Sequence, residues 1–199
     1  MSCIIKNYLY LGGASDVTAE FITKNNIRTI INVAIECDDI VENIRYFMYD
    51  LYDDFVDISR HFAEVVGLIK NGFKFGGVLV HCKAGISRSA SFVVAYMIKE
   101  IRMSVVGALE YIGRTRHVSP NPCFMRQLMH LEMTTLGTNS FAPKIDDYTI
   151  RCILAYAKLC SSMYGIVNEF YIETGKDVSE TYDKVRDFDD EYSFLYLLF

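Results

Sequence analysis

Cys82 and Arg88 are the two residues whose types and spacing most directly suggest chemistry. They lie in the segment 81–89, which reads His-Cys-Lys-Ala-Gly-Ile-Ser-Arg-Ser. A thiolate is a strong nucleophile, and a guanidinium six positions later can hold two phosphate oxygens in its planar fork. A cysteine and an arginine at this spacing also arise by chance, as a buried core residue and a solvated one. The prediction therefore depends on the whole string and on what surrounds it.

The surroundings of this string favour an anion site. Val78-Leu79-Val80 precedes it and an apolar stretch follows it, so we expect a loop between a buried strand and a helix. At such a turn the free backbone N–H groups converge, and the helix dipole adds positive potential that favours a phosphate dianion and a thiolate. Gly85 lets the loop adopt a conformation that a Cβ would oppose. The residues expected to hold the phosphate are Lys83, Ala84, Gly85, Ile86, Ser87 and Arg88.

Two neighbours of the string have supporting roles in this interpretation. The Ser89 hydroxyl lies where it can donate a hydrogen bond to the thiolate and ease its departure in a second step. His81 is expected to order the loop by hydrogen bonding rather than to act as a base.

Composition and charge exclude several other classes of protein. The net charge is −5 and no basic stripe runs along the chain, which argues against a nucleic-acid partner. The six cysteines form no C-x-x-C pair and the four histidines do not cluster with them, so we expect no zinc site. No cofactor is expected either. The longest apolar run, Phe92 to Ile98, is too short to span a bilayer. With no secretory pattern at the start, we expect a soluble cytoplasmic protein, with access to the nucleus possible.

Strand and helix patterns alternate along the first two thirds of the chain. The strands are expected over residues 8–11, 27–33, 44–51 and 78–80. The helices are expected over residues 15–25, 57–69, 88–100 and 104–114, and after Pro122. The expected caps are Ser15 or Asp16, Asp57 and Ser104. This alternation predicts an α/β sheet with helices on its faces.

The last third of the chain has a different character. We expect a domain over residues 1–136, a linker over 137–143 and a helical, acidic extension over 144–199. Apolar residues from Cys152 to Phe170 recur at helical spacing and form one seam, which packs either on the chain's own domain or on a second copy in a homodimer. Nine acidic and three basic residues occur between Glu169 and Glu191.

The string H-C-x-x-G-x-x-R-S resembles the signature of the dual-specificity protein phosphatases, within the cysteine-dependent tyrosine phosphatase superfamily. The resemblance covers about residues 4 to 135. Further matching segments are Tyr8–Gly12, Ile31–Val33, Ala95–Met97, Ser119–Pro122 and Phe124–Leu128. It implies a mixed, mostly parallel sheet flanked by helices on both faces, and a phosphatase that needs no metal. It also implies that Asn121 helps to fix the catalytic loop.

The resemblance further implies an aspartate that protonates the leaving oxygen. The family carries it about thirty residues before the cysteine, on a mobile loop ahead of an Asp-Ile-Ser helix start. Aligning on the preceding strand places Asp53 in this position, with Asp54 as the alternative, and Asp57 is better explained as the helix cap. The chain departs from the family at Asp50, where a proline is usual, and in a loop that looks one residue short.

The chemistry implied is hydrolysis through a cysteinyl-phosphate on Cys82, with phosphotyrosine, phosphoserine and phosphothreonine on proteins as substrates. Lys83 matches one lysine of the phosphoinositide phosphatases, so a lipid substrate stays an alternative. A second alternative is a non-catalytic, phosphate-binding protein on the same fold. Arg114, Arg116 and Arg126 could line a substrate surface, and we interpret them as ordinary surface charge.

Overall fold

The computed structural model describes residues 1–37, 43–54 and 56–140, which belong to one compact unit, Met1–Ser140. The predicted C-terminal extension, with its seam from Cys152 to Phe170 and its acidic stretch, lies outside the described residues. No helix in the part that the structure describes is both long enough and apolar enough to cross a membrane.

A five-stranded sheet forms the centre of this unit. Its strand order is β1-β2-β5-β3-β4, and all pairs are parallel except β1 with β2. The strands are β1 (Ser2–Ile5), β2 (Leu9–Gly13), β3 (Ile27–Asn32), β4 (Arg45–Met48) and β5 (Gly77–Cys82). The mixed, mostly parallel sheet confirms the fold expected from the resemblance. Strand β1 was not predicted, because four residues with one buried side chain carry little periodic signal.

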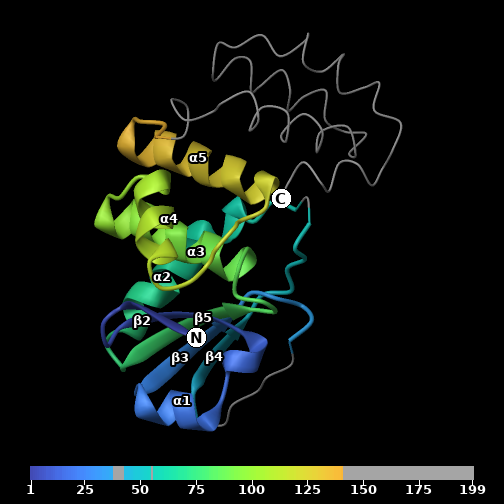
Figure 1. The fold of residues 1–199 in the computed structure, drawn as a ribbon, viewed down its shortest axis with the longest axis vertical. Helices are drawn as coiled ribbons and strands as arrows, with labels where there is room; N and C mark the ends of the chain where they lie inside the picture. Colours follow the sequence, from blue (N-terminus) through green and yellow to red (C-terminus); the bar gives the residue numbers. More distant parts are fainter. Residues whose placement is uncertain (38–42, 55, 141–199) are drawn as a thin grey trace. The chain divides into compact units, whose positions relative to one another are not determined.

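Helices cover both faces of the sheet (Figure 1). Helix α1 (Ala19–Lys24) lies on one face, where its Ile22 joins a buried cluster with Tyr10, Ile30 and Leu79 of three adjacent strands. The opposite face carries the other four helices, α2 (Phe62–Gly72), α3 (Arg88–Tyr96), α4 (Val105–Gly113) and α5 (Pro122–Leu136). Because side chains alternate along a strand, β2 and β5, which are buried throughout, supply side chains to both faces of the sheet.

Capping side chains set where several helices begin. Ser104 accepts a hydrogen bond from the Gly107 N–H at 3.1 Å, and Asn121 accepts one from the Phe124 N–H at 2.9 Å, so α4 and α5 begin as predicted. Helix α1 begins later than expected, because its cap is Thr18 rather than Ser15 or Asp16.

Asp57 stabilises the turn that leads toward α2, but the prediction that it caps this helix was wrong, because α2 begins at Phe62 and its N-cap residue is His61. Its Oδ1 accepts from the backbone N and the hydroxyl of Ser59, at 2.9 and 2.6 Å. A 3-10 turn, Ser59–His61, follows and runs directly into α2. Helix α3 continues at its C-terminal end into a π-helical turn, Met97–Ile101. This turn ends at Arg102, which has a φ of +62°.

The topology places strand β5 between β2 and β3, so its carboxyl end has neighbours on both sides. Cys82 pairs with Gly13 of β2, and His81 pairs with Asn32 of β3. In parallel sheets, ligands bind outside the carboxyl ends of the strands. The string identified in the sequence therefore lies where the fold favours a site.

Candidate active site

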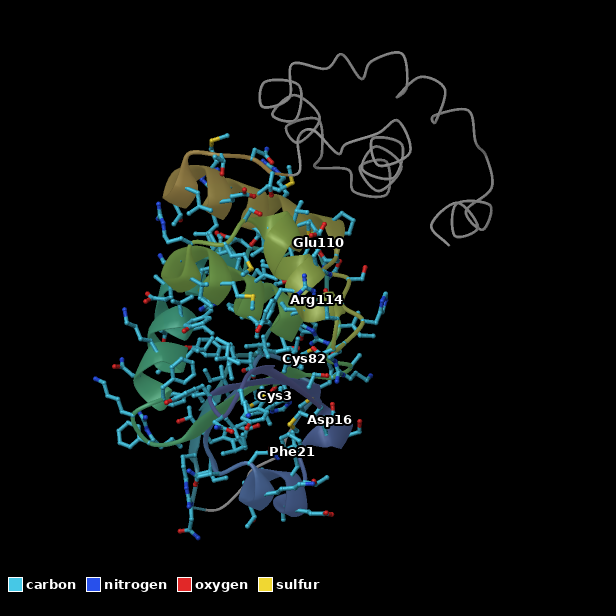
Figure 2. All side chains as sticks on the ribbon, turned by 60° about the vertical axis from the view of Figure 1, so that its left-hand side comes forward. Cys3, Asp16, Phe21, Cys82, Glu110 and Arg114 are labelled. Carbon is cyan, nitrogen blue, oxygen red and sulfur yellow. The ribbon has the colours of Figure 1, made fainter. Side chains whose placement is uncertain are left out.

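The cysteine loop (residues 82–88) joins the end of β5 to the start of α3. Cys82 is 1% exposed, and its Sγ accepts hydrogen bonds from the Gly85 N–H and the Ser89 hydroxyl, both at 3.2 Å. Figure 2 shows Cys82 between the sheet and the helices that cover it. Both donors stabilise negative charge on the sulfur. The predicted neighbours of the nucleophile are thus brought together around it.

The cysteine loop is in close backbone contact with the end of strand β2 and with the residue that follows it. The Ala14 N–H donates to the Lys83 carbonyl at 3.0 Å, and a Cβ on Gly13 would lie 2.8 Å from the same oxygen. Gly85 has φ +72°, and a Cβ there would lie 2.6 Å from the Gly12 carbonyl oxygen. Glycine is required at these positions because there is no room for a side chain and because φ is positive.

Arg116 holds the same loop from outside. Its Nε donates to the Gly85 carbonyl and its Nη2 to the Ala84 carbonyl, both at 2.8 Å, and its Nη1 donates to Asp16 Oδ2 at 3.2 Å. By binding carbonyls, Arg116 keeps them turned away from the sulfur, which leaves the amides free to face it. The interpretation of Arg116 as ordinary surface charge was therefore wrong.

Arg88 lies almost fully buried beside the loop. It is 3% exposed, and its Nη1 donates to the carboxylate of Glu36 and to the Leu51 carbonyl, the latter at 2.8 Å. Its Nε lies 3.7 Å from Asp53 Oδ2 and is buried without a hydrogen-bond acceptor among the described residues. The guanidinium is fixed on one side and keeps a donor for an anion on the other.

Glu36 is a site residue that the sequence analysis missed. It follows β3, whose carboxyl end lies next to that of β5. The hydrogen bond from Arg88 lowers the pKa of Glu36, although burial acts in the opposite direction. The one signal available in the sequence was an acidic residue just after a predicted buried strand.

Asp53 contacts the cysteine loop directly. Its Oδ1 accepts from the Ser87 hydroxyl at 2.7 Å and from Asn121 Nδ2 at 2.9 Å. Asp54 contributes instead near Cys123 on α5, where burial first, and then the charges of Asp57 and Asp54, raise the pKa of the thiol. These contacts favour Asp53 over Asp54 as the acid.

Helix α5 holds the aspartate loop (residues 50–59) through Gln127. The Gln127 Oε1 accepts from the backbone N–H groups of Ile58 and Ser59, both at 2.8 Å. Its Nε2 donates to the Val56 carbonyl at 2.9 Å. Gln127 lay inside a matching segment, but nothing in its spacing indicated this contact.

The remaining predicted residues differ in exposure. Lys83 and Ala84 are exposed, Ile86 is half-buried, and His81 is fully buried on β5. The Ile86 carbonyl accepts from the Ser119 N–H at 3.0 Å, which ties the loop to the segment before α5. The order that we expected from His81 stays a prediction.

The arrangement suits transfer of a phosphoryl group. It combines a nucleophile that receives two hydrogen bonds, a buried arginine with a free donor, and a carboxylate attached to the same loop. All predicted catalytic residues, Cys82, Arg88, Asp53 and Ser89, are brought to one place.

Comparisons with known proteins point to a family of phosphatases. A model of the family described as "Dual specificity phosphatase, catalytic domain" matches residues 9–134. The MAP kinase phosphatase with leucine-rich repeats protein 3 of Dictyostelium discoideum is 36% identical over 136 residues, which cover 66% of this chain and 16% of that protein. Dual specificity protein phosphatase 2 of Mus musculus is 36% identical over 134 residues, covering 65% and 42%.

A solved structure shares the fold as well. The crystal structure of the human tyrosine phosphatase-like serine/threonine/tyrosine-interacting protein has a TM-score of 0.62 and 33% identity, and covers 68% of this chain and 97% of that chain. The curated relatives are thus much longer than the region they share with this chain, whereas the solved domain is shared almost entirely.

Proposed function

The chain belongs to the dual-specificity phosphatase family, and from this premise we propose that it hydrolyses phosphotyrosine and phosphoserine or phosphothreonine in proteins through a cysteinyl-phosphate intermediate. The observation that carries the proposal is the attachment of nucleophile and acid to one loop. Cys82 Sγ receives its hydrogen bonds from Gly85 and Ser89, while Asp53 is bonded to Ser87 between them.

In the first step Cys82 attacks phosphorus and the bond from phosphorus to the leaving oxygen breaks. Asp53 gives its proton to that oxygen, so an alcohol or phenol departs. The charge on the equatorial oxygens is stabilised by the amides of the cysteine loop and by Arg88 Nε, which has no hydrogen-bond acceptor among the described residues. Glu36 and the Leu51 carbonyl hold the guanidinium so that it needs no rearrangement.

In the second step water attacks the cysteinyl-phosphate and the sulfur departs as a thiolate. Asp53 takes the proton from the water. The Ser89 hydroxyl, 3.2 Å from Sγ, supplies a hydrogen bond to the departing thiolate. This contact supports the role proposed for Ser89.

Hydrolysis of p-nitrophenyl phosphate tests the proposal. We expect turnover that vanadate abolishes, and a loss of about 10³-fold or more in the Cys82→Ser variant, because a hydroxyl lacks the thiolate's nucleophilicity. Cys3→Ser is the matched control, since this cysteine is exposed on strand β1. Retained turnover in Cys82→Ser would contradict the scheme.

A protein substrate is distinguished from the lipid alternative by comparing phosphopeptides with a phosphoinositide panel. The loop offers one exposed lysine, Lys83, whose charge also helps to lower the pKa of Glu36. With a single lysine facing solvent in the cysteine loop, we expect phosphopeptides to be the better substrates. Faster turnover of phosphoinositides would reverse the assignment.

A binding-only protein is the other candidate, since one structural relative is named phosphatase-like. The presence of thiol, guanidinium and carboxylate in one arrangement favours catalysis.

The homodimer expected from the C-terminal seam stays a prediction, which sedimentation of the whole chain and of a Met163→Glu variant would test. We expect the variant to be monomeric if the seam joins two copies.

A further inference from the structure

The Ser87 hydroxyl has a fixed orientation, which affects which carboxylate oxygen of Asp53 can carry a proton. Ser87 is 7% exposed, and its Oγ lies 3.1 Å from the backbone N of Asn121 and 2.7 Å from Asp53 Oδ1. A backbone N–H can only donate, so Ser87 Oγ is the acceptor in the first contact. Its single proton is therefore directed at Asp53.

Asn121 directs a second donor at the same oxygen. Its Nδ2 lies 2.9 Å from Asp53 Oδ1, while its own Oδ1 accepts from the Phe124 N–H at 2.9 Å. Because that cap bond needs the amide oxygen on the helix side, the NH₂ group must face Asp53. The orientation of this amide is thus set by α5.

The two oxygens of Asp53 consequently differ. Oδ1 accepts two hydrogen bonds, whereas Oδ2 accepts none from the residues that the structure describes and lies 3.7 Å from Arg88 Nε. A proton on Oδ1 would face two donors that point toward it. The acid therefore carries its proton on Oδ2, on the side of the arginine that binds the phosphate.

We propose that Ser87 is a positioning residue that, together with Asn121, reserves Oδ2 of Asp53 for proton transfer. The inference rests on the proposed function. In the first step Oδ2 gives its proton to the leaving oxygen while the S–P bond forms and the O–P bond breaks. In the second step Oδ2 takes a proton from water while the new O–P bond forms and the S–P bond breaks.

Ser87 also joins the acid to the loop that holds the phosphate. Its side chain makes no capping bond to α3, although Ser87 occupies the residue before that helix. A serine at this position would ordinarily cap the helix with its hydroxyl. Here the hydroxyl is used across the site, which fixes the distance between acid and phosphate.

The test compares leaving groups in Ser87→Ala. p-Nitrophenolate departs readily without a proton, whereas phenolate needs one. We expect Ser87→Ala to lower kcat/KM for phenyl phosphate by about tenfold or more, and for p-nitrophenyl phosphate by about twofold or less, because only the acid is disturbed. The inhibition constant of vanadate should stay unchanged, because residue 87 is expected to hold the anion with its backbone amide while its hydroxyl donates to Asp53. Ser87→Thr should restore most of the activity on phenyl phosphate.

Two further variants separate this role from general support of the loop. Ser89→Ala is the matched control, since its hydroxyl contacts Sγ instead of Asp53 and its loss should slow both substrates alike. In Asp53→Asn, adding Ser87→Ala should cause no further loss on phenyl phosphate, because Ser87 acts only through the acid.

Three results would overturn the inference. They are an equal loss on both substrates with weaker vanadate inhibition, no loss on phenyl phosphate, and additive losses in the double variant. A wild-type chain that hydrolyses neither ester would overturn the proposed function itself. The wild type is measured first, so this result is distinguished from a failure of the inference about Ser87.

Discussion

The cysteine loop and the aspartate loop meet at one site but are held in place in different ways. The cysteine loop is fixed mainly by backbone contacts, through the glycines of β2, the positive φ of Gly85 and the carbonyls bound by Arg116. The aspartate loop is fixed by side chains of other elements, namely Ser87, Asn121 and Gln127.

The difference teaches how the two loops should respond to change. The cysteine loop is held by close backbone contacts and has no room for added atoms, so a substitution that displaces it should abolish anion binding. The aspartate loop is held by a few side-chain hydrogen bonds, so the loss of one bond should misalign it only partly. Damage to the first should therefore weaken the binding of phosphate analogues, whereas damage to the second should spare binding and slow catalysis.

Gly85→Ala should have the largest effect. The new Cβ would meet the Gly12 backbone, and a φ of +72° is unfavourable for alanine by about 1–2 kcal/mol. We expect vanadate affinity and kcat/KM to fall together by about a hundredfold or more, because the loop amides can no longer converge. Isothermal calorimetry with vanadate and steady-state kinetics measure both quantities.

Gly67→Ala is the matched control, because a Cβ there meets nothing within 4 Å in the middle of α2. It should leave activity unchanged and raise the free energy of unfolding by about 0.5–1 kcal/mol. Full activity in Gly85→Ala would show that backbone contact does not fix the cysteine loop.

Arg116→Ala should have an intermediate effect. It removes the hydrogen bonds to the Ala84 and Gly85 carbonyls, and we expect vanadate affinity to fall about tenfold, which corresponds to about 1.4 kcal/mol. Arg116→Lys should recover little, because an ammonium cannot bind two carbonyls with a planar fork. Exposed Arg114, two positions earlier, supplies the control variant Arg114→Ala.

If Arg116→Lys matched the wild type, the charge of residue 116 rather than its hydrogen bonds would be what matters. The carbonyl contacts would then not explain how the loop is held.

Gln127→Ala should have the smallest effect. It removes the acceptor for the Ile58 and Ser59 N–H groups and the donor to the Val56 carbonyl. We expect kcat on phenyl phosphate to fall by about three- to tenfold with unchanged vanadate affinity, since only the acid is misaligned. Gln127→Glu keeps the acceptor and should fall less, while exposed His130→Ala on the same helix should have no effect.

Weaker vanadate binding in Gln127→Ala, equal to that in Arg116→Ala, would remove the distinction between the two loops.

The same contrast explains what could be predicted from the sequence. The cysteine loop follows from a continuous string between a strand and a helix, and the predicted cap Ser104 lies next to the helix it begins. Local patterns suffice for such features. Closeness in the sequence also suffices to bring Cys82, Arg88 and Ser89 together, because all three lie at one turn between a strand and a helix.

Contacts between distant residues left no such signal. Glu36 lies 52 positions from Arg88, and Gln127 lies 69 from Ile58. Arg116 resembles any charged residue near the end of a helix until its carbonyl partners are known. The start of α1 was not predicted because Ser15, Asp16 and Thr18 are all good caps. In the structure Asp16 accepts hydrogen bonds from Gly13 and Arg116, and Thr18 is the residue that caps the helix.

The central claim is that phosphate passes through a covalent bond to Cys82. Rapid acid quenching of Asp53→Asn with p-nitrophenyl phosphate tests it most directly, because this variant keeps the first step with a good leaving group and slows the second. Peptide mass spectrometry should find one phosphoryl group on the peptide that contains Cys82, and none after Cys82→Ser. A phosphoryl group on another residue, or continued turnover without any phosphorylated peptide, would contradict the account.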